Sequence, residues 1–249
     1  MSGELQDNRG RGDVPSIIPR IHPEGRKFAL GLLALSLVFA WFAWETLAWP
    51  LAFLALAVLA FFRDPERIVP QDDRLILSPA DGRVVQIDQV VPPHELMAND
   101  GSGIDGLSAN PVTRISIYLS VFDMHIQRTP IGGTIRRLVY VPGKFLSADL
   151  DKASEDNERQ HFLIERSDGT RVGVTQIAGL VARRIIAFAK PGDSLGAGQR
   201  LGMIRFGSRV DVYLPPETGS YVMLGQRVIA AETVLAALGS QPLLEGVSQ

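Results

Sequence analysis

Two long apolar runs near the N-terminus limit what this chain can fold into. Residues 28–44 and 47–62 contain no charged side chain and are separated only by Glu45 and Thr46. As helices, the runs extend about 25 Å, slightly less than a bilayer core of about 30 Å. A stretch of this length can be buried in a protein core, but it favours a lipid bilayer. We therefore predict a membrane helical hairpin over residues 28–62, which either spans the bilayer with local thinning or dips in and returns.

Residues around these runs predict how the hairpin is oriented. The three tryptophans lie at the bend, as expected where a bend reaches a headgroup interface: Trp41, Trp44 and Trp49. Basic residues flank the open ends: Arg20, Arg26, Lys27, Arg63 and Arg67. Because cytoplasmic flanks are enriched in such cations, we expect both termini on the cytoplasmic side of the cell (inner) membrane. Residues 1–27 lack periodicity and are predicted to be a flexible tail.

The pattern changes at residue 63 to short alternating runs punctuated by Gly and Pro, which predicts a mainly β fold for residues 63–249. Strands are expected at 83–91, 113–121, 133–141, 183–189, 200–206, 209–214 and 220–231, with a β-hairpin over 161–177 that turns at Asp168 and Gly169. Such spacing is typical of a barrel or a sandwich. Residues 92–111 are predicted to form a long loop of the kind used as a lid or binding loop.

Composition excludes several classes of function. The chain has no cysteine, so it contains no disulfide, thiolate metal site or cysteine nucleophile. Its net charge of −2 gives no electrostatic footprint for nucleic acid. The four histidines have no metal-ligand spacing, and we expect no metal centre: His22, His94, His125 and His161.

Three polar residues in separate segments can carry chemistry. Asp81 lies in "SPADGRV", His125 follows an apolar strand in "YLSVFDMHIQRTPIGG", and Ser208 follows Gly207. Each has an ordinary structural interpretation, because Asp-Gly and Gly-Ser pairs are common turns and a lone histidine is more often structural than catalytic. Together they permit a catalytic triad, which is defined by geometry rather than chain order. No GxSxG elbow or GxxxxGK[ST] phosphate loop is present.

The chain resembles the phosphatidylserine decarboxylase family, in particular its shorter bacterial and archaeal form. The resemblance runs from about residue 62 to residue 238. It is carried by six motifs in order: "SPADGRV", "YLSVFDMHIQRTPIGG", "GKFLSADLDKASEDNER", "GLVARRI", "GDSLGAGQRLGMIRFGS" and "RVDVYLP". Each motif is weak alone, but their order behind an apolar hairpin is specific.

This resemblance implies a self-processing enzyme that makes its own cofactor. The family cuts its chain before a serine, here between Gly207 and Ser208, giving a β chain (1–207) and an α chain (208–249) that stay together as a heterodimer. Ser208 then becomes a covalent pyruvoyl group, which forms a Schiff base with the substrate. The implied activity is decarboxylation of the membrane phospholipid phosphatidylserine to phosphatidylethanolamine. A further homo-oligomer is left open, as is a substrate with an archaeal lipid backbone.

The resemblance also implies residue roles, with one departure. Asp81 matches the aspartate of self-processing, and His125 matches a histidine of proton transfer. Longer members have a second histidine where this chain has Arg128, and arginine is not a base at ordinary pH. Arg128 suits a substrate phosphate or carboxylate, as do Arg183 and Arg184, although a solvated strand-end charge is an alternative for each.

Other functions stay open on sequence alone. "ADGRVVQI" and "KPGDSLGAGQRLGMI" resemble the half-repeats of biotinyl- and lipoyl-type hybrid barrels, which would suit a carrier, but no lysine lies at a hairpin tip. A membrane-anchored serine hydrolase would use Asp81, His125 and an intact Ser208. A purely structural membrane protein would need none of these residues.

Overall fold

The computed structural model describes residues 19–98, 105–144, 156–179, 184–204 and 207–240. These residues divide into two compact units. The smaller unit combines residues up to 66 with 121–124, and the larger combines 67–120 with residues from 125 onward.

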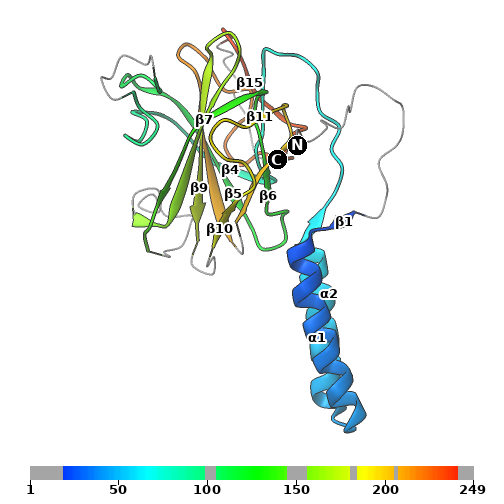
Figure 1. Cartoon of the computed structure of the whole chain (residues 1–249). Coiled ribbons are helices and arrows are strands. Elements are labelled where there is room, and N and C mark those ends of the chain that lie inside the picture. Colours follow the sequence, from blue (N-terminus) through cyan, green and yellow to red (C-terminus); the bar gives the residue numbers. More distant parts are fainter. Residues whose placement is uncertain (1–18, 99–104, 145–155, 180–183, 205–206, 241–249) are drawn as a thin grey trace. The chain divides into compact units, whose positions relative to one another are not determined.

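In the smaller unit the apolar runs form two helices, as predicted. Helix α1 spans Pro23–Trp41 and helix α2 spans Glu45–Phe61, and they form an antiparallel hairpin (Figure 1). Helix α1 begins within the range that the sequence assigned to the tail, since His22 caps it by accepting the Glu24 N–H at 3.4 Å. Strands β1 (Arg20–Ile21) and β2 (Arg63–Asp64) pair at the open end. Neither helix in this described region has the length and apolar character required of a membrane-crossing span.

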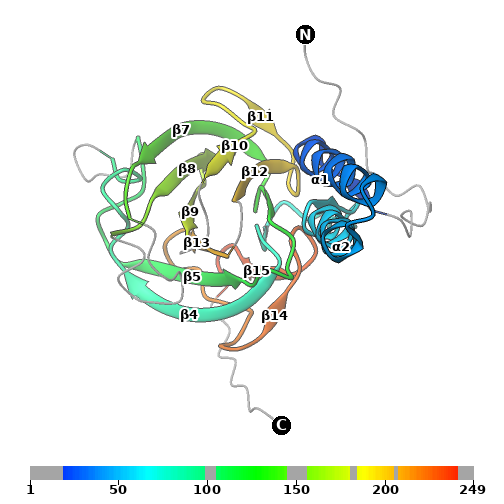
Figure 2. The same cartoon turned by 90° about the horizontal axis from the view of Figure 1, so that it is seen from below.

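The larger unit is built around one curled antiparallel sheet, which confirms the mainly β prediction (Figure 2). Its strands, in spatial order, are β11 (Ser194–Leu195), β7 (Gly133–Val141), β8 (Arg159–Glu165), β9 (Arg171–Ala178), β13 (Ser208–Tyr213), β5 (Val112–Leu119), β4 (Gly82–Val90) and β14 (Arg227–Val228). A second sheet has the order β10 (Ile185–Ala187), β12 (Arg200–Ile204) and β6 (Ile126–Arg128), and a third pairs β15 (Val234–Ala237) with β3 (Leu75–Leu77). Strands β10 and β12 lie inside the curve of the large sheet.

Strand positions follow the sequence patterns with one clear exception. Strand β7 matches its predicted range, and strands β8 and β9 flank the predicted turn at Asp168 and Gly169. The prediction of a long strand over 220–231 was wrong, because only Arg227–Val228 pairs there and turns and bends interrupt the rest. Val222 is buried in the core without sheet pairing, and Val228 is buried in the core from the short strand β14.

Strand β13 has two buried faces of opposite character. On the inner face, Val210 and Val212 join the main apolar core. On the outer face, Arg209 and Asp211 are fully buried and form an ion pair of 2.7 Å, and Arg209 also donates to Ser116 Oγ at 2.9 Å. The predicted loop covers this outer face: Leu96 and Leu107 pack with Val112, Leu163 and Tyr213.

His161 lies in this outer polar layer, with Nδ1 2.8 Å from Thr175 Oγ1 and Nε2 3.9 Å from a Glu95 carboxylate oxygen. Burial lowers its pKa from 6.5 to about 4, although Glu95 opposes the shift and Arg159 and His94 add to it. The unfolded chain therefore binds a proton that the folded chain excludes. The free energy of unfolding should fall as pH drops from about 6.5 towards about 4.

We predict that His161→Gln removes this pH dependence. The wild type should lose about 3 kcal/mol more than the variant between pH 7 and pH 4, since each pKa unit corresponds to about 1.4 kcal/mol. Urea unfolding of both proteins at a series of pH values measures the difference. Parallel pH profiles for the two proteins would contradict the assignment.

Candidate active site

Ser208 occupies the first position of strand β13, on the inner face. It pairs in register with Leu119 of β5 and Ala178 of β9, both of which belong to the main core. The side chain is fully buried, and its Oγ has no hydrogen-bond partner among the described residues. A buried hydroxyl without a partner is unusual, because such groups normally form hydrogen bonds. This hydroxyl is therefore available for chemistry.

Both the N–H and the carbonyl of Gly207 form hydrogen bonds. Its N–H donates to Nε2 of His125 at 3.2 Å, and its carbonyl oxygen accepts the N–H of Gly179 at 3.1 Å. Its φ of +55° lies in the left-handed region that favours glycine. The carbonyl next to Ser208 thus already has a backbone donor on its oxygen.

His125 reaches this site from the residue before β6. The side chain is 1% exposed, and the His125 carbonyl accepts the N–H of Ile204 in β12 at 3.2 Å. Because Nε2 accepts the Gly207 N–H, that nitrogen offers a lone pair and the neutral ring carries its proton on Nδ1. His125 contacts the residue before Ser208 and can therefore act as a base there.

Asp81 lies in a buried ion pair. One carboxylate oxygen accepts a hydrogen bond from Arg67 at 2.6 Å, and the other accepts the N–H of Ala230 at 3.1 Å. Arg67 also lies 3.7 Å from Glu232. The side chains of Asp81 and Arg67 are each 10% exposed. The carbonyl of Pro79, two residues earlier, accepts the Arg128 N–H at 2.8 Å, so this segment runs beside β6.

The three arginines proposed for substrate binding differ in burial and in whether the structure describes them. Arg128 is buried and its Nη1 donates to the Gly198 carbonyl at 3.0 Å, so the interpretation as a solvated strand-end charge is wrong for it. Arg184 is exposed just before β10. Arg183 lies outside the described residues. Substrate contact stays a prediction for all three.

The structure therefore brings His125, Gly207 and Ser208 together and places Asp81 on the segment beside β6. Sequence reasoning missed the Gly179 N–H, since a backbone donor leaves no signal in residue type. It also treated Arg67 only as a cation flanking the hairpin, although Arg67 binds Asp81. Its position near the start of the stretch that resembles the family, which runs from about residue 62, was the available clue.

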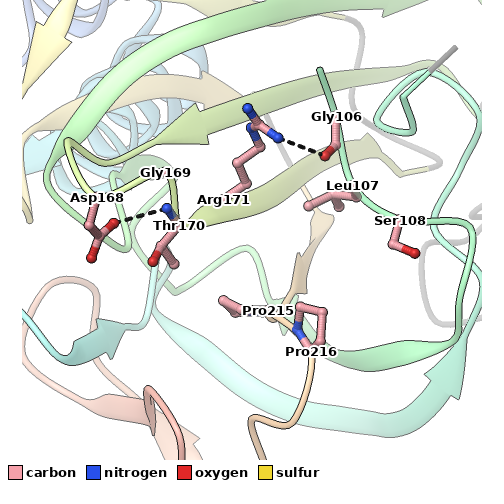
Figure 3. A pocket seen from close by; sticks show the side chains of 9 residues that line it. All are labelled: Gly106, Leu107, Ser108, Asp168, Gly169, Thr170, Arg171, Pro215 and Pro216. Atoms are coloured by element: carbon pink, nitrogen blue, oxygen red, sulfur yellow. Dashed lines mark hydrogen bonds between the residues drawn. The ribbon is translucent and has the colours of Figure 1, made fainter. Parts of the chain in front are cut away.

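A surface pocket lies away from this site (Figure 3). Its volume is about 430 Å³, and its lining includes Leu107, Ser108, Thr170, Arg171 and Pro215. Pro215 follows the end of β13, whereas Ser208 begins that strand, so the strand length of about 17 Å separates them. The pocket therefore has no part in chemistry at Ser208.

A buried serine hydroxyl, a histidine lone pair and a backbone donor grouped around one glycine define a serine-centred catalytic site. Comparison with known proteins identifies the family. The family model for phosphatidylserine decarboxylase matches residues 54–236. The chain belongs to the phosphatidylserine decarboxylase family and is an enzyme of the decarboxylase type.

Curated relatives agree over the whole chain. A phosphatidylserine decarboxylase proenzyme of Novosphingobium aromaticivorans is 64% identical over 100% of this chain and 99% of its own length. The proenzyme of the same name in Erythrobacter litoralis is 63% identical over 100% of both chains. The one in Zymomonas mobilis is 55% identical over 96% of this chain and 95% of its own length. These matches confirm the resemblance inferred from the six motifs.

We predict that Asp81→Asn lowers the free energy of unfolding by about 3 kcal/mol, because it leaves the buried Arg67 cation without its closest carboxylate. Asp81→Asn combined with Arg67→Met should recover most of that loss, since neither charge then remains. Urea unfolding of precursors that also carry Ser208→Ala measures both effects on uncut chains. A single variant as stable as its parent would contradict a structural ion pair.

Proposed function

We propose that this enzyme decarboxylates phosphatidylserine to phosphatidylethanolamine and CO₂, after cutting itself between Gly207 and Ser208 and converting Ser208 to a pyruvoyl group. The proposal rests on one observation above all. The hydroxyl of Ser208 is buried and has no hydrogen-bond partner among the described residues, and the preceding residue is a left-handed glycine whose N–H and carbonyl both form hydrogen bonds. The curated relatives are named proenzymes, which supports a processing step.

In the first step Ser208 Oγ attacks the carbonyl carbon of Gly207. His125 takes the hydroxyl proton, and the N–H of Gly179 stabilises the negative charge that develops on the Gly207 oxygen. The peptide C–N bond then breaks, and its nitrogen takes up a proton. The product is an ester between Gly207 and the Ser208 side chain, with no change in the number of atoms.

In the second step the ester is eliminated. A base removes the Cα proton of residue 208, the Cβ–Oγ bond breaks, and the carboxylate of Gly207 leaves as the new C-terminus of the β chain. The dehydroalanine at residue 208 takes up one water and loses ammonia. The α chain then begins with a pyruvoyl group at residue 208, and the two chains stay paired as a heterodimer.

The site around residue 208 fits a pyruvoyl group. The side chain lies inside the core, next to apolar residues such as Leu119 and Ala178, where bulk water is excluded. When formed, the group supplies an electrophilic ketone that condenses with an amine and accepts the electrons left when CO₂ departs. His125 then remains beside it as a group that can hold or return a proton.

The substrate is a lipid, and the helical hairpin suits a membrane surface. The side chains around its bend are apolar and largely exposed, with Trp41 at 86%, Trp44 at 57% and Trp49 at 63%. Exposed apolar surface of this extent marks an interaction site. We propose that the hairpin inserts into the inner membrane and that the larger unit works on its cytoplasmic side.

Replacing Ser208 by Ala should leave a single chain without decarboxylase activity, because neither the ester nor the ketone can form. The wild type should show two chains in an intact-mass spectrum, the smaller with 42 residues (249 − 207) and a blocked N-terminus that borohydride reduces. Ser194→Ala, at an exposed position of β11, is the matched control and should be cut normally. A cut Ser208→Ala chain would exclude Ser208 as the nucleophile. An uncut wild type labelled at Ser208 by a phosphonate would favour a hydrolase.

Replacing the three tryptophans by serine should weaken membrane binding by at least about 10-fold, because each buried aromatic side chain contributes about 2 kcal/mol. Flotation with vesicles of phosphatidylglycerol and phosphatidylethanolamine measures the bound fraction. Leu224→Ser is the matched control, since Leu224 is 65% exposed but lies in the larger unit. Equal losses in the two proteins, or no loss in either, would argue against insertion of the hairpin.

A further inference from the structure

Three buried glutamines from three strands form a chain of hydrogen bonds inside the larger unit. Gln160 of β8 donates from Nε2 to Oε1 of Gln176 in β9 at 3.3 Å, and Gln176 donates from Nε2 to Oε1 of Gln127 in β6 at 2.7 Å. Gln127 and Gln176 are fully buried, and Gln160 is 5% exposed. A cluster of buried polar side chains within an apolar core costs free energy unless its groups are satisfied.

This chain ends in an unsatisfied donor. Both amide oxygens that receive hydrogen bonds are fixed by their neighbours, so each NH₂ group points onward along the chain. The last one, Nε2 of Gln127, is buried and has no hydrogen-bond partner among the described residues. An orphaned buried donor calls for an explanation, and a ligand that supplies an acceptor is one.

The unsatisfied amide belongs to the same region as residue 208. Gln176 pairs in register with Val210, and Ser208 is the next inward-facing residue of β13. Gln127 lies two residues after His125, so the start of β6 and the residue before it place one side chain against Gln176 of β9 and one against Gly207, which precedes β13. The amide and Ser208 Oγ are thus two unsatisfied polar groups in one buried region.

The backbone of β12 leaves room for this arrangement. A Cβ atom on Gly202, which pairs in register with Gln127, would lie 2.8 Å from the Gln176 amide nitrogen and 2.7 Å from the Ile186 carbonyl oxygen. A side chain at position 202 would therefore displace the amide that orients Gln127. Glycine here keeps the chain of glutamines in place.

We propose that the side-chain amide of Gln127 binds the carboxylate of the substrate's headgroup, an inference that rests on the proposed function. In a serine headgroup the amine and the carboxylate share one carbon, whereas the phosphate lies further away, towards the lipid. The amine must reach residue 208, so the carboxylate enters the same buried region. Gln127 is then a substrate-binding residue that selects amines carrying a carboxylate.

A neutral donor suits this task better than a cation. The negative charge of the carboxylate disperses as CO₂ leaves, so an arginine at this position would stabilise the ground state more than the transition state. An amide orients the carboxylate through a hydrogen bond with less stabilisation of its charge. The two preceding glutamines fix the direction of that bond.

Two substitutions separate recognition from packing. Gln127→Glu keeps the oxygen that accepts from Gln176 but lacks the donor, and Gln127→Leu removes both. Thr175→Val is the matched control, because it changes a buried polar residue of β9 that contacts His161 in the outer layer and takes no part in the chain of glutamines. All four proteins are first checked by mass spectrometry for complete cleavage at Gly207 and Ser208.

Two measurements are then made on the cleaved proteins. The first is kcat/KM for phosphatidylserine vesicles, which should fall about 10-fold to 100-fold in both Gln127 variants, as for a lost hydrogen bond to a charged group. The second is the yield of phosphatidylethanolamine attached covalently to the α chain by cyanoborohydride. That lipid has the amine but no carboxylate, so its yield should be unchanged. Thr175→Val should match the wild type in both measurements.

The outcomes distinguish the two proposals. Equal losses with both lipids, or no loss with phosphatidylserine, would overturn carboxylate recognition and leave Gln127 a structural residue. If Gln127→Leu does not fold, Gln127→Glu decides the matter alone, since it preserves the bond to Gln176. A wild type that is neither cleaved nor able to trap phosphatidylethanolamine would instead refute the proposed function.

Discussion

The pairing of strand β13 on both edges is the constraint on which the site depends. All six of its residues pair with β5 on one side and with β9 on the other. Ser208 begins this strand, so the backbone pairing fixes the position of a hydroxyl that has no hydrogen bond of its own among the described residues. If the chain is cut before Ser208, the new N-terminus remains fixed in the centre of an eight-stranded sheet.

The outer face of β13 contributes a buried ion pair to the structure, and the inner face carries the candidate catalytic residue. The outer face carries the buried Arg209–Asp211 ion pair under the long loop, and the inner face carries Ser208 and two valines. Ion pairs of this kind add little net stability, but they are costly to disrupt once formed. Arg209 also donates to Ser116 of β5, so the charge next to residue 208 is linked to the neighbouring strand. The hydrogen bond from Arg209 to Ser116 therefore helps to keep the first residues of β13 in place.

Sequence patterns predicted the parts of the fold that depend on local chemistry. The apolar runs gave the helical hairpin, alternation gave β7, and the Asp168–Gly169 pair gave the turn between β8 and β9. The long strand over 220–231 failed because apolar residues at turns mimic an alternating strand. Ser208 and His125 could be named from motifs, whereas the Gly179 N–H and the orphaned amide of Gln127 required the strand register. Contacts between strands far apart in the chain carry no local signal.

The geometry also bears on how His125 can serve as a base without a second histidine at position 128. His22 belongs to the smaller unit, the His94 side chain is 83% exposed, and His161 faces the outer layer. His125 is therefore the histidine placed at Gly207, and buried Arg128 donates to the Gly198 carbonyl. In the uncut chain the Gly207 N–H uses the lone pair of His125 Nε2. To take the Ser208 hydroxyl proton, Nε2 exchanges this N–H for the hydroxyl, and after cleavage the same nitrogen serves proton transfer to the substrate. On the proposed chemistry, one base therefore serves both reactions in sequence.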